Sequence, residues 1–151
     1  MIFVECNADK RLLISLGIQA KEIWHVFSKG NICNRLRKNK KCLGLVDEDP
    51  DSGKPQYLGT LTLDSHDSGV KVLNDKNNQN KIIVLCPRLE DWIVAAAKQA
   101  EVDLATYHFP DHGKAFHKVV NSRLDDFKKL LKDLKESSLM VKHLMSLLPS
   151  G

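Results

Sequence analysis

The stretch that decides the fold is Cys42-Leu43-Gly44-Leu45-Val46-Asp47-Glu48-Asp49. Its first five residues are almost all apolar, as in a strand that is buried on both faces of a parallel sheet. Acidic residues follow at once, so carboxylates stand at the carboxyl end of that strand. This end is where α/β proteins place their functional side chains. The stretch therefore predicts both a parallel sheet and a site at its edge.

Similar apolar runs lie on both sides of this stretch. They predict strands near residues 2–5, 23–27, 42–46 and 82–86, with helical patterns between the first three. Strands that alternate with helices imply right-handed crossovers and a parallel sheet. We therefore expect an α/β fold with a central, mainly parallel four-stranded sheet and helices on both faces.

The remaining segments are predicted as follows. Turn residues interrupt 52–80, and only Val70-Lys71-Val72-Leu73 within it resembles a short strand. The tail has leucines at three- and four-residue steps, which predict helices packed on the core or, alternatively, a helix that joins two copies into a homodimer. We expect an α/β domain at 1–105 and a C-terminal helical extension at 106–151, packed on the same domain.

The composition is typical of a soluble globular protein, with 42% hydrophobic and 28% charged residues. No apolar run is long enough to cross a bilayer, and the N-terminus lacks the basic segment of a signal peptide. We therefore expect a cytoplasmic protein with no membrane partner. The four cysteines form no CxxC pair, which excludes common zinc spacings. The net charge of +4 permits nucleic-acid binding without requiring it.

Carboxylates end two of the predicted strands. Glu5 follows the first strand, Asp47 ends the third, and Asp49 comes two residues later. If these strands are neighbours, the acids share one crevice, where they stay ionised together only in the presence of a cation. Hard carboxylate oxygens suit Mg²⁺ or Mn²⁺. The alternative is that Asp47 and Asp49 belong to a solvated turn, since the Pro-Asp-Ser-Gly that follows is common turn chemistry.

The order of these residues resembles the Toprim domain, which has Glu-x-x-x-Asp after its first strand, Gly after the second and Asp-x-Asp after the third. The residues that carry the resemblance are Glu5, Asp9, Gly30, Asp47, Asp49 and Gly53. The resemblance covers residues 1–55 and is closest to the Toprim domains of overcoming-lysogenization-defect (OLD) nucleases and ribosomal-RNA maturases. It implies a three-layer fold and a nucleic-acid phosphodiester hydrolase that depends on Mg²⁺ or Mn²⁺.

The resemblance also implies roles for single residues. Glu5 would act in proton transfer or metal binding, and Asp47 and Asp49 would bind metal, so these three are the candidate catalytic residues. Asp9 would stabilise the start of the first helix behind them. Arg88-Leu89-Glu90-Asp91-Trp92 is similar to a helix start of the OLD-like branch, which adds Glu90 as a metal ligand. The alternative for Glu90 is a favourable interaction with the helix dipole.

One residue departs from the Toprim pattern. The family usually has Gly directly after its first glutamate, and this chain has Cys6, whose side chain can crowd an approaching phosphate. This departure leaves open a non-catalytic Toprim-like module that binds nucleic acid or a protein. A phosphotransferase that acts on small phosphate esters is a third hypothesis.

Basic side chains are candidates for contacts with nucleic acid. Lys29 lies in the turn after the second strand, and Arg35, Arg37 and Lys38 belong to a basic run. Near a metal site they would bind a phosphate backbone, whether of DNA or RNA. The alternative is that the run is only a solvated helix face. A small substrate would make no contact with it.

Two further groups of side chains have no assigned function. His108, His112 and His117 could bind metal or act as bases, but their spacing matches no zinc pattern. Trp24 and Trp92 are expected in the core rather than as platforms for stacking bases.

Overall fold

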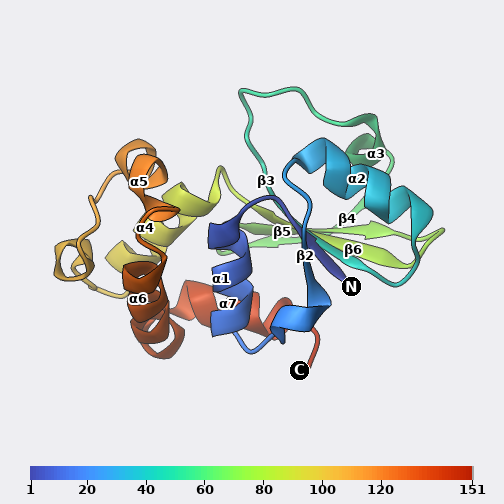
Figure 1. The fold of residues 1–151 in the computed structure, drawn as a ribbon. Helices are drawn as coiled ribbons and strands as arrows, with labels where there is room; N and C mark the ends of the chain where they lie inside the picture. Colours follow the sequence, from blue (N-terminus) through green and yellow to red (C-terminus); the bar gives the residue numbers. More distant parts are fainter. Residues whose placement is uncertain (151) are drawn as a thin grey trace.

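The computed structural model describes residues 1–150 and builds them around one mixed sheet of six strands (Figure 1). The strand order is β2-β1-β3-β6-β5-β4. The strands are β1 (Ile2–Val4), β2 (Ile23–His25), β3 (Leu43–Asp47), β4 (Thr62–Asp67), β5 (Val70–Asp75) and β6 (Asn80–Leu85). The α/β class predicted from the sequence is confirmed.

The four predicted strands form the parallel part of this sheet, and they correspond to β1, β2, β3 and β6. The expected number of four strands was wrong, because β5 pairs antiparallel with β6 and β4 pairs antiparallel with β5. β4 has almost no apolar pattern and most of its residues are exposed, so it is a strand through its pairing with β5 rather than through burial.

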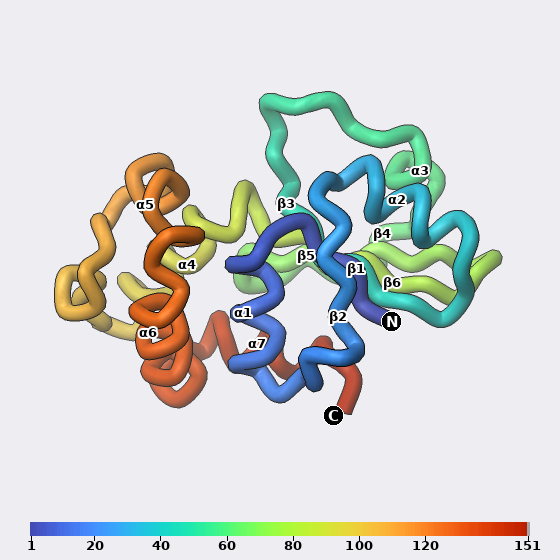
Figure 2. Tube along the Cα trace, in the orientation of Figure 1, coloured from blue at the N-terminus to red at the C-terminus, as the bar shows by residue number. Residues whose placement is uncertain are grey.

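Helices cover both faces of the sheet, as predicted. On one face lie α2 (Lys29–Lys38) and α3 (Gln56–Gly59), which pack on a core that contains Phe3, Val46 and Ile82. The larger core on the other face is covered by the remaining helices (Figures 1 and 2). These are α1 (Asn7–Ser15), α4 (Leu89–Gln99), α5 (Gly113–Val120), α6 (Leu124–Ser137) and α7 (Leu139–Leu147), with short 3-10 turns at Ala20–Glu22 and Leu104–Tyr107.

The leucine stripe of the tail is buried within the chain. Leu130 and Leu134 of α6 and Leu144 of α7 are fully buried in the same core as Leu12 and Leu13 of α1. Residues 106–150 therefore share their core with the sheet. None of the helices within residues 1–150 combines the length and apolar character needed to span a membrane.

The order of the strands creates a crevice. From β1 the chain crosses through α1, on one face, to β2; it then crosses through α2, on the other face, to β3. The first connection leaves the carboxyl end of β1 towards β2, and the second leaves the carboxyl end of β2 and returns past β1 to β3, on the other side of β1. The carboxyl ends of β1 and β3 therefore lie where the strand order reverses. Such a switch point is where α/β sheets bind ligands. Gly44 lets α2 pack closely on β3, since a Cβ there would lie 3.0 Å from Ile32 and Leu36 side-chain atoms.

Candidate functional site

A cleft of about 980 Å³ opens at the carboxyl ends of the parallel strands. Its lining comes from residues at or just after the ends of β1 and β3 and from the starts of α2, α4 and α5, where α4 follows β6. The charged and histidine side chains of its lining are Glu5, Asp9, Lys29, Asp47, Asp49, Asp51, Arg88, Glu90, Asp91, His112, Lys114 and His117. All four acids that the sequence proposed as metal ligands therefore line one cleft.

Asp47 is the last residue of β3 and lies deep in this cleft. Its Oδ1 accepts a hydrogen bond of 2.9 Å from the backbone N–H of Leu89, at the start of α4. The pKa of Asp47 is raised to about 8, mainly by burial and also by the nearby Asp9, Glu90 and Glu5 carboxylates, while the hydrogen bond from Leu89 lowers it in part. The ionised form of Asp47 is therefore disfavoured in the cleft, because the surrounding protein offsets its negative charge only in part.

Asp9 is buried and closes the first turn of α1. Its Oδ2 accepts hydrogen bonds from the backbone N–H of Cys6 at 3.2 Å and from the Cys6 thiol at 3.3 Å. Burial raises the pKa of Asp9 to about 7, with Glu5 and Glu90 adding to the effect. The role predicted for Asp9, at the helix start behind the site, fits this position. Cys6 thus has a structural partner, and burial raises its thiol pKa.

Glu5 comes directly after β1 and is partly exposed in the cleft. Burial raises its pKa; Lys29 lowers it, while Asp49 and Glu90 raise it. The carboxylates of Glu5, Asp9, Asp47 and Glu90 therefore influence one another, as expected for acids that share a crevice.

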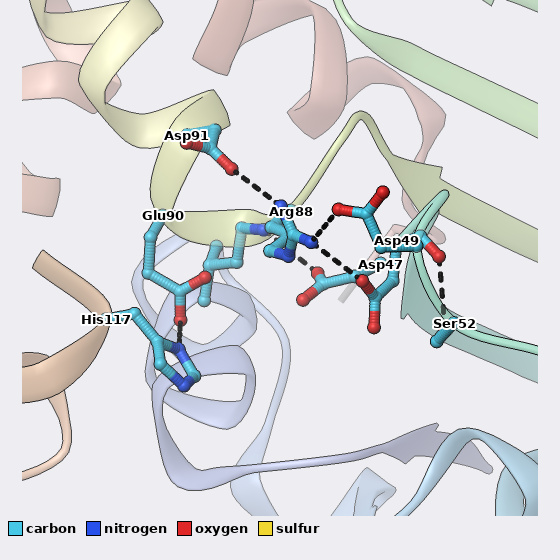
Figure 3. Close-up of polar contacts among 9 residues, drawn as sticks. Asp47, Asp49, Ser52, Arg88, Glu90, Asp91 and His117 are labelled. Carbon is cyan, nitrogen blue, oxygen red and sulfur yellow. Dashed lines mark hydrogen bonds and ion pairs between the residues drawn. The ribbon is translucent and has the colours of Figure 1, made fainter. Parts of the chain in front are cut away.

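Glu90 lies in the first turn of α4, and its side chain is only 5% exposed. Its Oε1 lies 2.9 Å from Nδ1 of His117, on α5 (Figure 3). Its Oε2 is buried and has no hydrogen-bond partner among residues 1–150. The sequence proposed Glu90 but assigned no role to His117. The two residues are 27 positions apart, so no local spacing could have joined them.

Asp49 lies in the same cleft but is bound to Arg88. Nη2 of Arg88 lies 2.9 Å from Oδ1 of Asp49 and 3.2 Å from Oδ2 of Asp51, and its Nη1 lies 3.7 Å from Asp91 (Figure 3). Arg88 therefore ties the loop after β3 to the start of α4. Sequence reasoning missed this arginine, because its partners are 37 and 39 residues away.

The proposed nucleic-acid-binding residues divide into two groups. Lys29 lines the cleft, and its Nζ donates to the backbone oxygen of Glu48 at 3.1 Å. Arg35, Arg37 and Lys38 lie in the last turns of α2, towards the amino end of β6, and do not line the cleft. These three residues therefore lie outside the cleft, because α2 starts at the cleft and runs away from it. Lys114 of α5, which the sequence did not single out, lies in the cleft instead.

The histidines and tryptophans noted in the sequence also lie in different places. His112 lines the cleft, whereas His108 lies away from it, 3.6 Å from Asp126. Trp92 is buried, as expected, and donates to the backbone oxygen of Ser68. Trp24 is 49% exposed on the edge strand β2, so its assignment to the core was wrong.

The cleft supplies oxygen donors of the kind that magnesium prefers. Within residues 1–150, however, no three His, Cys, Asp or Glu side chains are grouped closely enough to hold a metal ion as they stand. The side chains are turned to other partners, with Asp47 on the Leu89 N–H, Asp49 on Arg88 and Glu90 on His117.

Comparison with family models, curated proteins and solved structures finds no match to this chain.

Proposed function

We propose that this chain is a divalent-metal-dependent phosphodiester hydrolase of the Toprim type that acts on nucleic acid. The observation that carries the proposal is that Glu5, Asp47 and Glu90, which follow three neighbouring parallel strands, line one cleft. Burial and the neighbouring carboxylates raise the pKa values of Glu5 and Asp47, so ionising these acids together costs free energy in the absence of a cation. A divalent cation would offset this cost and would let a phosphate group approach an acidic surface.

The residues of the cleft fit magnesium or manganese. Glu5, Asp47 and Glu90 would hold the ion, and the buried Oε2 of Glu90, unpartnered among residues 1–150, is free to do so. Asp49 would join them only by exchanging Arg88 for the ion. A bound ion would polarise the scissile phosphoryl group and lower the pKa of a bound water.

The chain's own side chains would perform the other tasks. Lys29 and Lys114 would bind phosphate oxygens at the two sides of the cleft. Glu5 is partly exposed and has a raised pKa, so instead of sharing the ion it would be suited to accept a proton from the attacking water. Arg88 would hold the loop after β3 in position through Asp49 and Asp51.

The test is nuclease activity of the purified chain on single- and double-stranded DNA and RNA, with Mg²⁺ or Mn²⁺. We expect cleavage that chelation with EDTA abolishes. Glu5→Gln should lower turnover more than substrate affinity, since proton transfer acts in the transition state. Asp47→Asn should weaken metal binding. Asp64→Asn, on the exposed strand β4, is the matched control and should cleave normally.

A non-catalytic Toprim-like module that binds nucleic acid or a protein is the alternative. It is favoured by the ion pair of Arg88 with Asp49, which already neutralises part of the Asp-x-Asp pair, and by Cys6 at the usual Gly position. Binding of nucleic acid without cleavage by either metal, over the whole substrate panel, would replace the hydrolase with this module.

A further inference from the structure

Phe27 is the most exposed large apolar side chain of the residues described, with 75% of its surface accessible. It follows β2 and lines the cleft at the point where the chain turns into α2. Its φ of 73° lies in the left-handed region, which a bulky residue rarely adopts. The fold therefore holds an aromatic ring in solvent, in an unfavourable backbone conformation, beside the acids of the site.

The ring is not isolated. The centroids of Phe27 and His25 lie 4.1 Å apart, with an angle of 32° between the ring planes. Neither residue belongs to the cores on the two faces of the sheet. The two rings therefore support each other where Phe27 lines the cleft, and Phe27 stays largely exposed despite this contact.

The surroundings define what this ring can bind. Lys29, two residues after Phe27, lines the same cleft and is suited to a phosphate. The carboxylates that would hold a divalent cation lie deeper in it. A ligand that brings a flat aromatic ring to Phe27 and a phosphate to Lys29 and the cation is a nucleotide unit. Base–aromatic stacking is tolerant of sequence because every base has a π-face.

We infer that Phe27, supported by His25, is a platform on which an unpaired nucleobase stacks while the adjacent phosphate enters the acidic cleft. The inference rests on the proposed function for its phosphate site, and it adds the substrate class. Within a duplex both faces of a base are covered by its neighbours, so the platform favours single strands, frayed ends or flaps over intact duplex.

The test measures the affinity of a fluorescein-labelled single-stranded oligonucleotide by anisotropy with Mg²⁺, in a Glu5→Gln background that suppresses cleavage. Removing one base–aromatic stack should lower the affinity by about 5- to 150-fold. We expect that loss for Phe27→Ala and near-parental affinity for Phe27→Trp. Leu63→Ala, which removes another exposed apolar side chain on the far edge strand β4, should have no effect. A labelled strand of the same length made of abasic sites should bind the Phe27→Ala and parental proteins equally.

Several results would overturn the platform: no loss with Phe27→Ala, an equal loss on the base-containing and abasic strands, or no binding of either strand by the parental protein. The same holds if sedimentation shows that Phe27→Ala acts by dissociating a homodimer. The same measurements distinguish a failure of the stacking platform from a failure of the proposed hydrolase activity. Base-dependent binding without cleavage by the Glu5-containing protein keeps the platform and removes the hydrolase, whereas cleavage without base-dependent binding does the reverse.

Discussion

Glu90 depends on a single neighbour on another helix. Its carboxyl group is buried, and among residues 1–150 its only hydrogen-bond partner is His117, whose side chain is 68% exposed. An orphaned buried carboxyl is costly, but water can reach the position that the histidine leaves. The contact therefore links the start of α4 to α5 at modest strength.

We predict that His117→Ala lowers the free energy of unfolding by about 1 kcal/mol, the low end for a lost partner of a buried polar group. Urea denaturation followed by circular dichroism measures the change. His112→Ala is the matched control, because His112 lines the same cleft without a side-chain hydrogen bond in the described chain. Equal stability of the two variants would show that the contact with Glu90 contributes nothing.

The sequence placed Glu5 and Asp47 correctly in a shared cleft, because a residue directly after a buried parallel strand has little freedom in where it lies. It did not foresee that Arg88 would bind Asp49. That contact depends on how the loop after β3 folds over the start of α4, and the two residues are 39 positions apart. Local patterns carry no information about such a contact.

At the level of elements, the direction of α2 decides which lysines and arginines can contact a phosphate bound in the cleft. The helix starts at the cleft, where Ser28 caps it by accepting from the Asn31 N–H, and it ends at the opposite edge. A rise of about 1.5 Å per residue carries Arg35 and Lys38 far from the acids. Arg37 lies over the ring of Tyr57 instead, at 5.8 Å from its centroid.

We predict that Lys29→Ala combined with Lys114→Ala weakens nucleic-acid binding and flattens its dependence on salt. Each lost phosphate contact should reduce the slope of log K against log [salt] by about 0.7–0.9. The matched pair Arg35→Ala with Lys38→Ala removes the same charge from the far end of α2 and should leave the slope unchanged. Fluorescence anisotropy titrations at several salt concentrations measure both. A larger effect of the α2 pair would place the phosphate path outside the cleft.

Predictability also differed between elements. β1, β3 and β6 have short, continuous apolar runs rich in Ile, Val and Leu, which favour buried strands over longer helices, so their positions followed from the sequence. β4 reads Thr-Leu-Asp-Ser-His-Asp and is largely exposed, and its pairing with β5 is a tertiary contact that no local pattern encodes. The strands most remote from the candidate site were therefore the hardest to predict.

For the whole molecule, the acids of the cleft link stability to pH and to divalent cations. The pKa of Asp9 is raised from 3.8 to about 7 and that of Asp47 from 3.8 to about 8, mainly by burial. A carboxyl with a raised pKa in the folded state favours folding while it is protonated. Its contribution is complete below pH 3.8, the unfolded value, and is lost as the pH rises through the folded values.

We predict that, without divalent cations, the contribution of the cleft to the free energy of unfolding falls between about pH 4 and pH 8, by on the order of a few kcal/mol. Mg²⁺ should restore much of it at pH 8, because bound cations favour the ionised carboxylates. Asp47→Asn keeps an acceptor for the Leu89 N–H and should reduce both effects, whereas Asp64→Asn should not. Urea denaturation across this range, with and without Mg²⁺, is the measurement. Stability at pH 8 that is insensitive to both Mg²⁺ and Asp47→Asn would contradict it.

β4, one of the two edge strands of the sheet, affects how copies of this chain interact at high concentration. Its outer edge presents unpaired backbone donors and acceptors, which in other proteins can pair with the edge strand of another molecule and cause aggregation. Here the register shifts between Leu63 and Ser65, and Asp64 and Asp67 bring negative charge to the strand. A kinked and charged border is a poor template for an identical neighbour. The strand that contributes least to the core thus protects the folded chain against fibre formation.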